Sequence, residues 1–531
     1  MNISRSWAVL ACALAALPCP AADRYAGADA LARRIDDRLA SAWKQAGVPP
    51  AADADDSEWL RRVYLDLAGR IPSVTEARAF LADRREDRRR LLVERLLGGP
   101  RFATHFATVW RNLLLPEGNV NFQVRFSLPG FEKWLRDWVV SGRGYDAMVT
   151  ELLTTAIRPG GGALQIGGAP GPAPFYSAKE FKPEEIAGAV ARTFLGVNLS
   201  CAQCHNHPFA DWKREQFWSF AAFFSGIKVQ RRGDFVTAEA EKADSHEIEI
   251  PGTDKVVKAK YLNGQQAEVA KGAKAREVLA RWMTAKDNPY FARAIVNRMW
   301  AHFFGTGLVE PLDEMTGTES QPSHPALLDE LAAGFVGHGH DLRWLMRAIT
   351  STKAYQLSSR RSHPGQDDGK LFAKMALRGL TPEQLYDSVA MATGFQEAAR
   401  GGGFYDAGGA RSEFLTKFAN GADRPTETQT SILQALTLMN GRVVTSATDL
   451  KRSETLAAVI DAPFLDTAAK VEALYLAALT RTPTAKEVSR MAAYVEKGGT
   501  AQTGKKQERR AEALADVFWV LLNSGEFVLN H

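Results

Sequence analysis

Hydrophobic side chains recur at helical spacing along most of the chain, which places them on one side of each predicted helix. In the range 28–225 successive segments repeat this pattern, and Trp59, Val63 and Leu67 form one clear example. Gly69 follows that stripe, and glycine commonly ends a helix. The range 28–225 is therefore predicted to form a helical domain.

Helix starts in this range also have a polar signature. Ser73 and Glu76 have the spacing of a capping box, in which each side chain accepts a hydrogen bond from the other residue's backbone N–H. A helix is expected to begin directly after Ser73. A further apolar stripe, Phe102 to Leu113, predicts another helix.

The pattern changes between residues 226 and 270. Glu247–Ile250 and Val256–Leu262 are β-prone, and the turn residues 251–254 separate them, as in a hairpin. Helical periodicity returns in the range 273–531. We therefore predict a mainly α protein, with two helical domains and a small β-hairpin insertion between them.

The composition is that of an ordinary globular protein. The chain has 531 residues, of which 45% are hydrophobic and 24% charged, so more than one domain is expected. Its 66 basic and 61 acidic residues give a formal net charge of +5, without a long one-signed run. Nucleic acid is therefore not an expected partner.

The first 22 residues have the layout of a signal peptide. Arg5 precedes an apolar run from Trp7 to Leu17, and small residues follow at Ala21 and Ala22. We predict a cleaved signal at 1–22 and export to the periplasm or the extracellular space. No later stretch of 18 apolar residues occurs, so no transmembrane segment is expected after cleavage.

Cleavage would leave only two of the four cysteines, Cys201 and Cys204, and His205 follows them at once. The spacing C-x-x-C-H is that of c-type haem attachment, in which two thiols bind the ring and the histidine ligates iron. Export agrees with this interpretation, because such sites are assembled outside the bacterial cytoplasm. We predict covalent haem c on Cys201 and Cys204, with His205 as the proximal iron ligand.

Other interpretations of the same segment stay open. The two cysteines could form a disulfide, or a zinc-type metal site could use them together with His205 and His207. On the far side of a haem, His105 is a candidate distal ligand, since it lies at the edge of the stripe Phe102 to Leu113. An open coordination position is the alternative, and it would favour ligand or peroxide chemistry over electron transfer.

A second candidate cluster lies in the C-terminal half. Helical projection places Arg298 and His302 on one apolar face. A cation there needs an acidic partner, for which Asp313 and Glu310 are the candidates.

Several segments resemble a known family. The run Asp56–Pro72, and Phe194–Val197 leading into Cys201–Phe209, resemble the planctomycete cytochrome C-like domain family. Segments such as Val296–Trp300 and Phe304–Pro311 resemble its usual companion, a helical domain of unknown function. The resemblance implies an exported protein whose biochemical role is unassigned.

Together these patterns predict an exported mono-haem cytochrome-like protein in electron transfer or haem-dependent redox chemistry. It would act as a haem-dependent oxidoreductase or carrier with an unidentified redox partner. The alternative is a non-catalytic envelope or extracellular binding protein, in which the C-x-x-C-H segment is a structural disulfide or a zinc clip.

Overall fold

The computed structural model describes residues 27–119, 121–157, 170–206, 211–232, 235–316, 320–395, 410–418, 442–500 and 503–531. The predicted signal at 1–22 lies outside these ranges. Helices dominate the described residues, and the strands form small two-stranded sheets, as the sequence predicted.

The first part of the chain is helical. Its elements are α2 (Ala28–Ala46), α3 (Asp56–Ala68), α4 (Val74–Ala82), α5 (Arg88–Leu97), α6 (Pro100–Leu114), η1 (Pro116–Asn119), α7 (Phe122–Arg125), α8 (Leu128–Ser141), α9 (Tyr145–Thr154), α10 (Pro174–Ser177), α11 (Pro183–Val190), η2 (Ala191–Leu195), η3 (Ser200–Gln203), α12 (Arg214–Ala221) and η4 (Ala222–Phe224).

Two hairpins follow, and then helices return. These elements are β1 (Ile227–Arg232), β2 (Phe235–Glu241), β3 (Glu247–Glu249), β4 (Val256–Lys258), α13 (Ala275–Met283), α14 (Phe291–Phe304), α15 (Pro325–Gly337), α16 (Leu342–Thr350), α17 (Lys353–Gln356), η5 (Pro364–Asp367), η6 (Gly369–Leu371), β5 (Arg378–Gly379), α18 (Pro382–Thr393), α19 (Ala410–Phe418), α21 (Arg442–Ala447), α22 (Glu454–Asp461), α23 (Thr467–Leu479), α24 (Ala485–Lys497), α25 (Lys506–Leu522), α26 (Gly525–Val528) and β6 (Leu529–Asn530).

Local signals in the sequence determine several of these boundaries. α3 ends at Gly69, whose φ of 68° is left-handed and therefore suits glycine. The predicted capping box is present at the start of α4: Ser73 Oγ accepts from the Glu76 N–H at 3.2 Å, and Glu76 Oε2 accepts from the Ser73 N–H at 2.7 Å. Both helix boundaries are confirmed.

The predicted hairpin is also confirmed, with an unpredicted one before it. β3 pairs antiparallel with β4, so Glu249 faces Val256 across the predicted turn. β1 pairs antiparallel with β2, with an irregularity between Lys228 and Val229. The insertion therefore contains two small hairpins.

The two hydrophobic cores do not coincide with the two helical parts that the hairpins separate. One hydrophobic core runs from Ala28 to Met375 and so includes residues on both sides of the hairpins. A second core is built from Leu380 to Phe527, and Leu65 and Ile71 join it from the N-terminal part. The hairpins therefore change the secondary structure without interrupting the first core.

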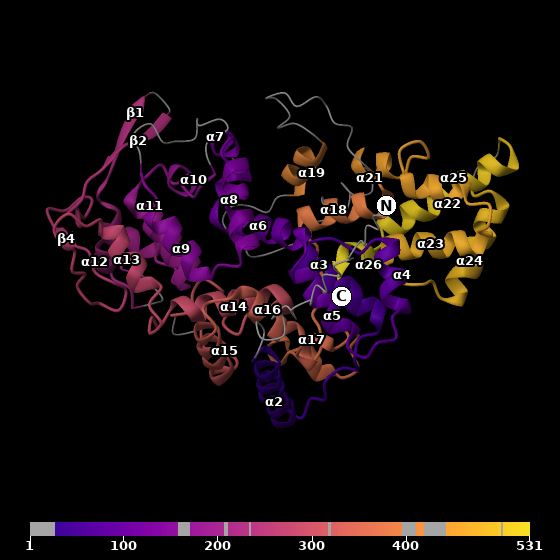
Figure 1. Cartoon of the computed structure of the whole chain (residues 1–531), viewed down its shortest axis with the longest axis horizontal. Coiled ribbons are helices and arrows are strands. Elements are labelled where there is room, and N and C mark those ends of the chain that lie inside the picture. The colour runs from indigo at the N-terminus through magenta and orange to yellow at the C-terminus, as the bar shows by residue number, and fades with distance from the viewer. Residues whose placement is uncertain are drawn as a thin grey trace, which may run out of the picture.

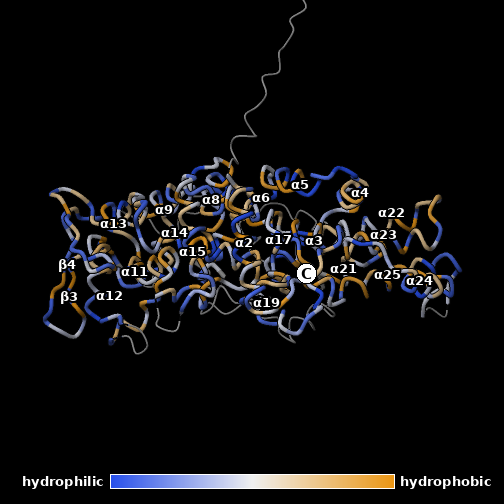
Figure 2. Tube along the Cα trace, turned by 90° about the horizontal axis from the view of Figure 1, so that it is seen from below, coloured by the Kyte–Doolittle hydropathy of each residue, from blue (hydrophilic) through white to orange (hydrophobic). Residues whose placement is uncertain are grey.

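Figure 1 shows an elongated arrangement, with α12 and β4 at one end, α24 and α25 at the other, and α3 between them. Hydrophobic and hydrophilic stretches alternate along the helices in Figure 2, as expected for helices that bury one side. Within the described residues, no helix is both long and apolar enough to cross a lipid bilayer.

α3 departs from the amphipathic pattern expected of it, because it is buried on every side. Arg61 and Arg62 are fully buried, and Asp66 is 1% exposed. Several of their partners lie far away in the sequence: Arg62 donates to the carbonyl oxygen of Tyr355 at 2.6 Å, and Arg61 to that of Phe527 at 2.6 Å. These bonds connect α3 to Tyr355 and to the end of the chain. They also supply the partners that buried charges require.

Candidate functional site

The C-x-x-C-H segment forms one helical turn at the surface. η3 carries Cys201, and the His205 N–H donates to the Cys201 carbonyl at 3.4 Å. Positions separated by three and four residues lie on the same side of such a turn. Cys201, Cys204 and His205 therefore share one side, and all three are exposed.

The two thiols and the imidazole of this turn can bind a prosthetic group. Both thiols are free. The Nδ1 atom of His205 lies 2.8 Å from the backbone oxygen of Asn206. Because a carbonyl oxygen only accepts, Nδ1 carries the proton, and the lone pair of a neutral ring is then on Nε2. His205 therefore presents a ligating nitrogen, and the donor set fits an iron-bound haem held by two thioethers.

The backbone of the turn is held from behind by α12. Ala202 is fully buried. Trp218 Nε1 donates to the Gln203 carbonyl at 3.0 Å, and the Arg214 N–H donates to Asn206 Oδ1 at 3.0 Å. A fixed backbone with exposed reactive side chains is the arrangement expected of a preorganised site.

The competing metal and disulfide interpretations stay predictions. His207 lies outside the described residues, so its part in a zinc set stays a prediction. Among the residues that the structure describes, no group of three or more His, Cys, Asp or Glu side chains is placed to hold a metal ion.

His105, the candidate distal ligand, lies in a different environment. Its ring packs against Gly69 and lies 6.0 Å from the ring of His302, measured between centroids. Burial lowers the pKa of His105 to about 3, so the ring is neutral, and its Nε2 is buried without a hydrogen-bond partner. None of its described contacts joins it to the Cys201–His205 turn, and its role as distal ligand stays a prediction.

In the predicted Arg298 cluster, the candidate residues bind different partners. Arg298 Nη2 donates to Asp313 Oδ1 at 2.8 Å. Glu310 instead accepts from the Gly307 N–H at 2.6 Å, and His302 Nε2 lies 3.1 Å from the carbonyl oxygen of Asp66. Of the two candidate partners, Asp313 therefore pairs with Arg298, and Glu310 binds the turn after α14.

A polar network around Asp66 was not predicted from the sequence. The Asp66 carboxylate is bound by Arg378 Nη2 at 2.9 Å, the Tyr355 hydroxyl at 2.7 Å and Asn530 Nδ2 at 2.7 Å. Every partner is more than 280 residues away, so no local spacing could have revealed the network. It joins α3 to β5, α17 and β6.

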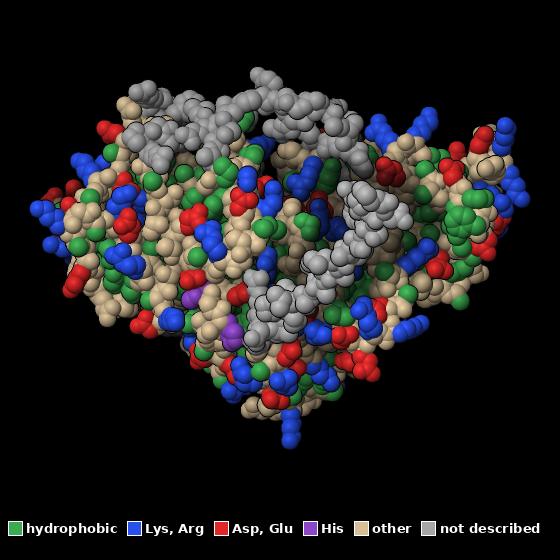
Figure 3. All heavy atoms as spheres, viewed as in Figure 1, with side chains coloured by type: hydrophobic (Ala, Val, Ile, Leu, Met, Phe, Trp, Pro, Cys, Tyr) green, Lys and Arg blue, Asp and Glu red, His purple; other side chains and the backbone are tan. Residues whose placement is uncertain are grey.

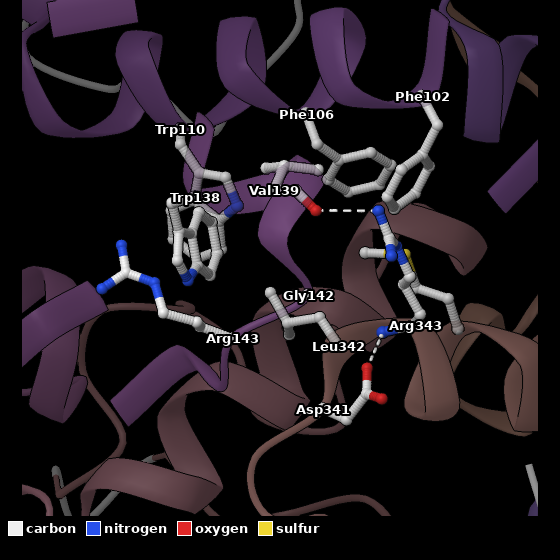
Figure 4. Close-up of a pocket in the computed structure, with 11 residues that line it drawn as sticks. Phe102, Phe106, Trp110, Trp138, Val139, Gly142, Arg143, Asp341, Leu342 and Arg343 are labelled. Atoms are coloured by element: carbon white, nitrogen blue, oxygen red, sulfur yellow. Dashed lines mark hydrogen bonds between the residues drawn. The ribbon is translucent and has the colours of Figure 1, made fainter. Parts of the chain in front are cut away.

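A hollow opens between α6, α8 and α16, and Figure 4 shows its aromatic walls. Arg343 crosses it and donates to the Val139 carbonyl at 2.7 Å, and Asp341 accepts from the Arg343 N–H at the start of α16. These contacts serve structure, so we assign this hollow no chemistry. Its lining residues are Phe102, Phe106, Trp110, Trp138, Val139, Gly142, Arg143, Asp341, Leu342, Arg343 and Met346.

The surface carries mixed charge. On the face drawn in Figure 3, basic and acidic side chains are interspersed across the molecule. This distribution agrees with the small net charge of the sequence.

Comparisons with known proteins give two family matches. Residues 34–229 match PSCyt2, described as a protein of unknown function (DUF1549), and residues 275–425 match PSD1, described as a protein of unknown function (DUF1553). These matches support the expected family and the order of its two parts. No curated protein and no solved structure matches the chain.

Proposed function

We propose that this chain is an exported, mono-haem c-type cytochrome-like protein that transfers electrons. Cys201 and Cys204 would hold the haem as thioethers, and His205 Nε2 would ligate its iron. A haem bound there supplies a one-electron redox centre. The name of the first matched family, PSCyt2, agrees with this proposal.

One observation carries the proposal: a single helical turn combines two free, exposed thiols with an exposed histidine whose Nδ1 atom is hydrogen-bonded to a backbone oxygen. The hydrogen bond from Nδ1 fixes the ring and leaves Nε2 available, as in many metal-ligating histidines. A disulfide would use the thiols but would give the histidine no role.

The position of the turn favours electron transfer over chemistry in an enclosed pocket. Cys201, Cys204 and His205 are exposed, whereas Ala202 between them is buried. A redox centre at such a position lies close to the surface that a partner would approach. We assign no distal ligand and no substrate.

The experiment is covalent haem retention. The full chain, including residues 1–22, is produced in a bacterium that matures c-type cytochromes, isolated from the exported fraction, denatured and separated by reversed-phase chromatography. The expected result is haem absorbance that elutes with the polypeptide and is abolished by the double variant Cys201→Ala/Cys204→Ala.

A matched control uses another histidine with the same local bond, the partly exposed His246. His246 Nδ1 also lies 2.8 Å from a backbone oxygen, that of Asp244, but no cysteine precedes it. His246→Ala should keep the wild-type iron spectrum, whereas His205→Ala should change it. A folded, exported wild-type protein without retained haem overturns the proposal, and zinc analysis with thiol titration then separates a metal clip from a disulfide.

A further inference from the structure

The Cys201–His205 turn is held by a segment from the other matched part of the chain. This segment, Asp313–Thr316, lies within the PSD1 match, whereas the turn lies within the PSCyt2 match. Val197 and Glu314 form an antiparallel bridge, and the Met315 N–H donates to the Gly196 carbonyl at 2.8 Å. Backbone pairing therefore fixes the chain just before the turn.

A side-chain relay then reaches the turn itself. Glu314 Oε1 accepts from Asn198 Nδ2 at 3.3 Å, and Asn198 Oδ1 accepts from the Ser200 N–H at 3.1 Å. Ser200 is the first residue of η3 and precedes Cys201 directly. Asn198 thus uses both ends of its amide, one toward Glu314 and the other toward the turn.

Close packing at Gly196 also holds the chain before the turn against the Asp313–Thr316 segment. Gly196 has a φ of +65°, and a Cβ atom placed there would lie 2.8 Å from Met315 Sδ and 3.3 Å from the Ala294 Cβ atom. Only glycine fits both the conformation and the approach. The chain entering the turn is therefore pressed against the Asp313–Thr316 segment and α14.

The segment also contacts the chain that follows the turn, and it is itself anchored. Trp212 Nε1 donates to Thr316 Oγ1 at 3.2 Å. On its inner side, Asp313 accepts from Arg298, which is only 8% exposed. The Asp313–Thr316 segment thus contacts both flanks of the turn, and its Asp313 is paired with Arg298 of α14.

We propose that Glu314 is a positioning residue for the Cys201–His205 turn, so that the redox site is built jointly by the two matched parts of the chain. The proposal deepens the proposed function and rests on it for the meaning of the site. Glu314 acts through Asn198: it orients the amide whose oxygen caps the first N–H of the turn.

The relay predicts a specific pattern among three variants. Glu314→Gln keeps an oxygen that accepts from Asn198, so it should leave the turn unchanged. Asn198→Asp places a carboxylate against Glu314, and the like charges should drive the relay apart. Combining the two substitutions restores a donor opposite an acceptor, because the Gln amide can donate to the Asp carboxylate.

Hydrogen exchange of the haem-free full chain reads the turn directly, because the Ala202 and His205 N–H groups are bonded within it. Loss of one hydrogen bond should speed exchange in the peptide covering 199–206 by about fivefold in Asn198→Asp. The double variant should return to the wild-type rate.

A backbone variant provides an independent test. Gly196→Ala should also speed exchange at 199–206, since its Cβ atom collides with Met315. Gly47→Ala is the matched control, because Gly47 has a φ of +66° but nothing within 4 Å of an added Cβ atom. It should leave exchange at 199–206 at the wild-type rate.

The outcomes separate this proposal from the haem assignment. Equal exchange at 199–206 in wild type, Asn198→Asp and Gly196→Ala overturns the positioning role, whether or not haem is retained. Failure of Glu314→Gln to rescue Asn198→Asp also overturns it. If the exchange pattern holds and no haem is retained, the positioning stands and the haem assignment fails. With haem bound, the iron spectrum should change in Gly196→Ala and stay unchanged in Gly47→Ala.

Discussion

At the scale of single residues, the histidines of this chain occupy opposite environments. His205 is exposed and His246 is partly exposed, and each has its Nδ1 atom next to a backbone oxygen. His105 and His302 face each other between α6 and α14, and burial lowers the pKa of both rings. The first kind is available to a ligand or to solvent, and the second is kept neutral by its surroundings.

This contrast predicts a pH dependence of stability. The pKa of His105 is about 3 in the folded chain and near 6.5 when unfolded, so the unfolded chain binds the proton first as pH falls. The neutral His105 ring therefore makes its full contribution to the free energy of unfolding above pH 6.5, and this contribution is lost progressively toward pH 3. Between pH 7 and 5 it amounts to about 2 kcal/mol.

Urea unfolding of His105→Gln and wild type at pH 7 and 5 measures this difference. The variant should lose about 2 kcal/mol less than wild type over that interval. The control His246→Gln, at a partly exposed position, should behave as wild type does. An equal loss in His105→Gln and wild type would show that His105 does not titrate in this way.

The residues of the candidate site were predictable to different degrees. Cys201, Cys204 and His205 are adjacent in the sequence, so their spacing alone predicted the site. The Arg298–Asp313 pair followed from a charge on an apolar helix face. Glu314 and Asn198 could not be predicted, because their contact joins positions 116 residues apart.

At the scale of elements, the polar side chains that cap a helix contribute to the stability of the fold. The Ser73 and Glu76 side chains satisfy each other's backbone N–H groups at the start of α4. Ser73→Ala removes one of these bonds and should cost about 1 kcal/mol. Chemical denaturation of the variant and wild type measures the difference, and a variant as stable as wild type would contradict the role of the cap.

Element boundaries followed from such signals, but burial did not. Gly69 and the capping box marked the end of α3 and the start of α4, and the turn residues 251–254 marked the β3–β4 hairpin. The sequence could not indicate that α3 is buried on all sides, because Arg61, Arg62 and Asp66 are paired by segments near residues 355, 378 and 530. Tertiary partners overrode the amphipathic pattern.

At the scale of the whole molecule, α3 joins the two hydrophobic cores. Most of its apolar side chains enter the first core, whereas Leu65 enters the second. Asp66, the residue after Leu65, binds Arg378 and Asn530, which lie on the paired strands β5 and β6. The polar network therefore fixes one core against the other.

Asp66→Asn should destabilise the fold strongly. The substitution removes the charge that Arg378 faces. It also places an amide NH2 group against one of two donors, either Tyr355 on the Oδ2 side or Asn530 on the Oδ1 side. Breaking such a buried arrangement should cost at least about 3 kcal/mol. Lys133→Ala, which removes an exposed pair with Asp137, is the control and should change stability little. A small effect of Asp66→Asn in calorimetry would contradict the joining role.

The central claim concerns the turn at Cys201–His205, and peptide mapping tests it most directly. Trypsin cleavage after Arg192 and Lys213 releases one peptide, Thr193–Lys213, that contains both cysteines. In protein exported from a host that matures c-type cytochromes, we predict that this peptide carries the mass of one haem after reduction and denaturation. The same peptide with both thiols unmodified, or joined by a disulfide before reduction, would contradict the claim.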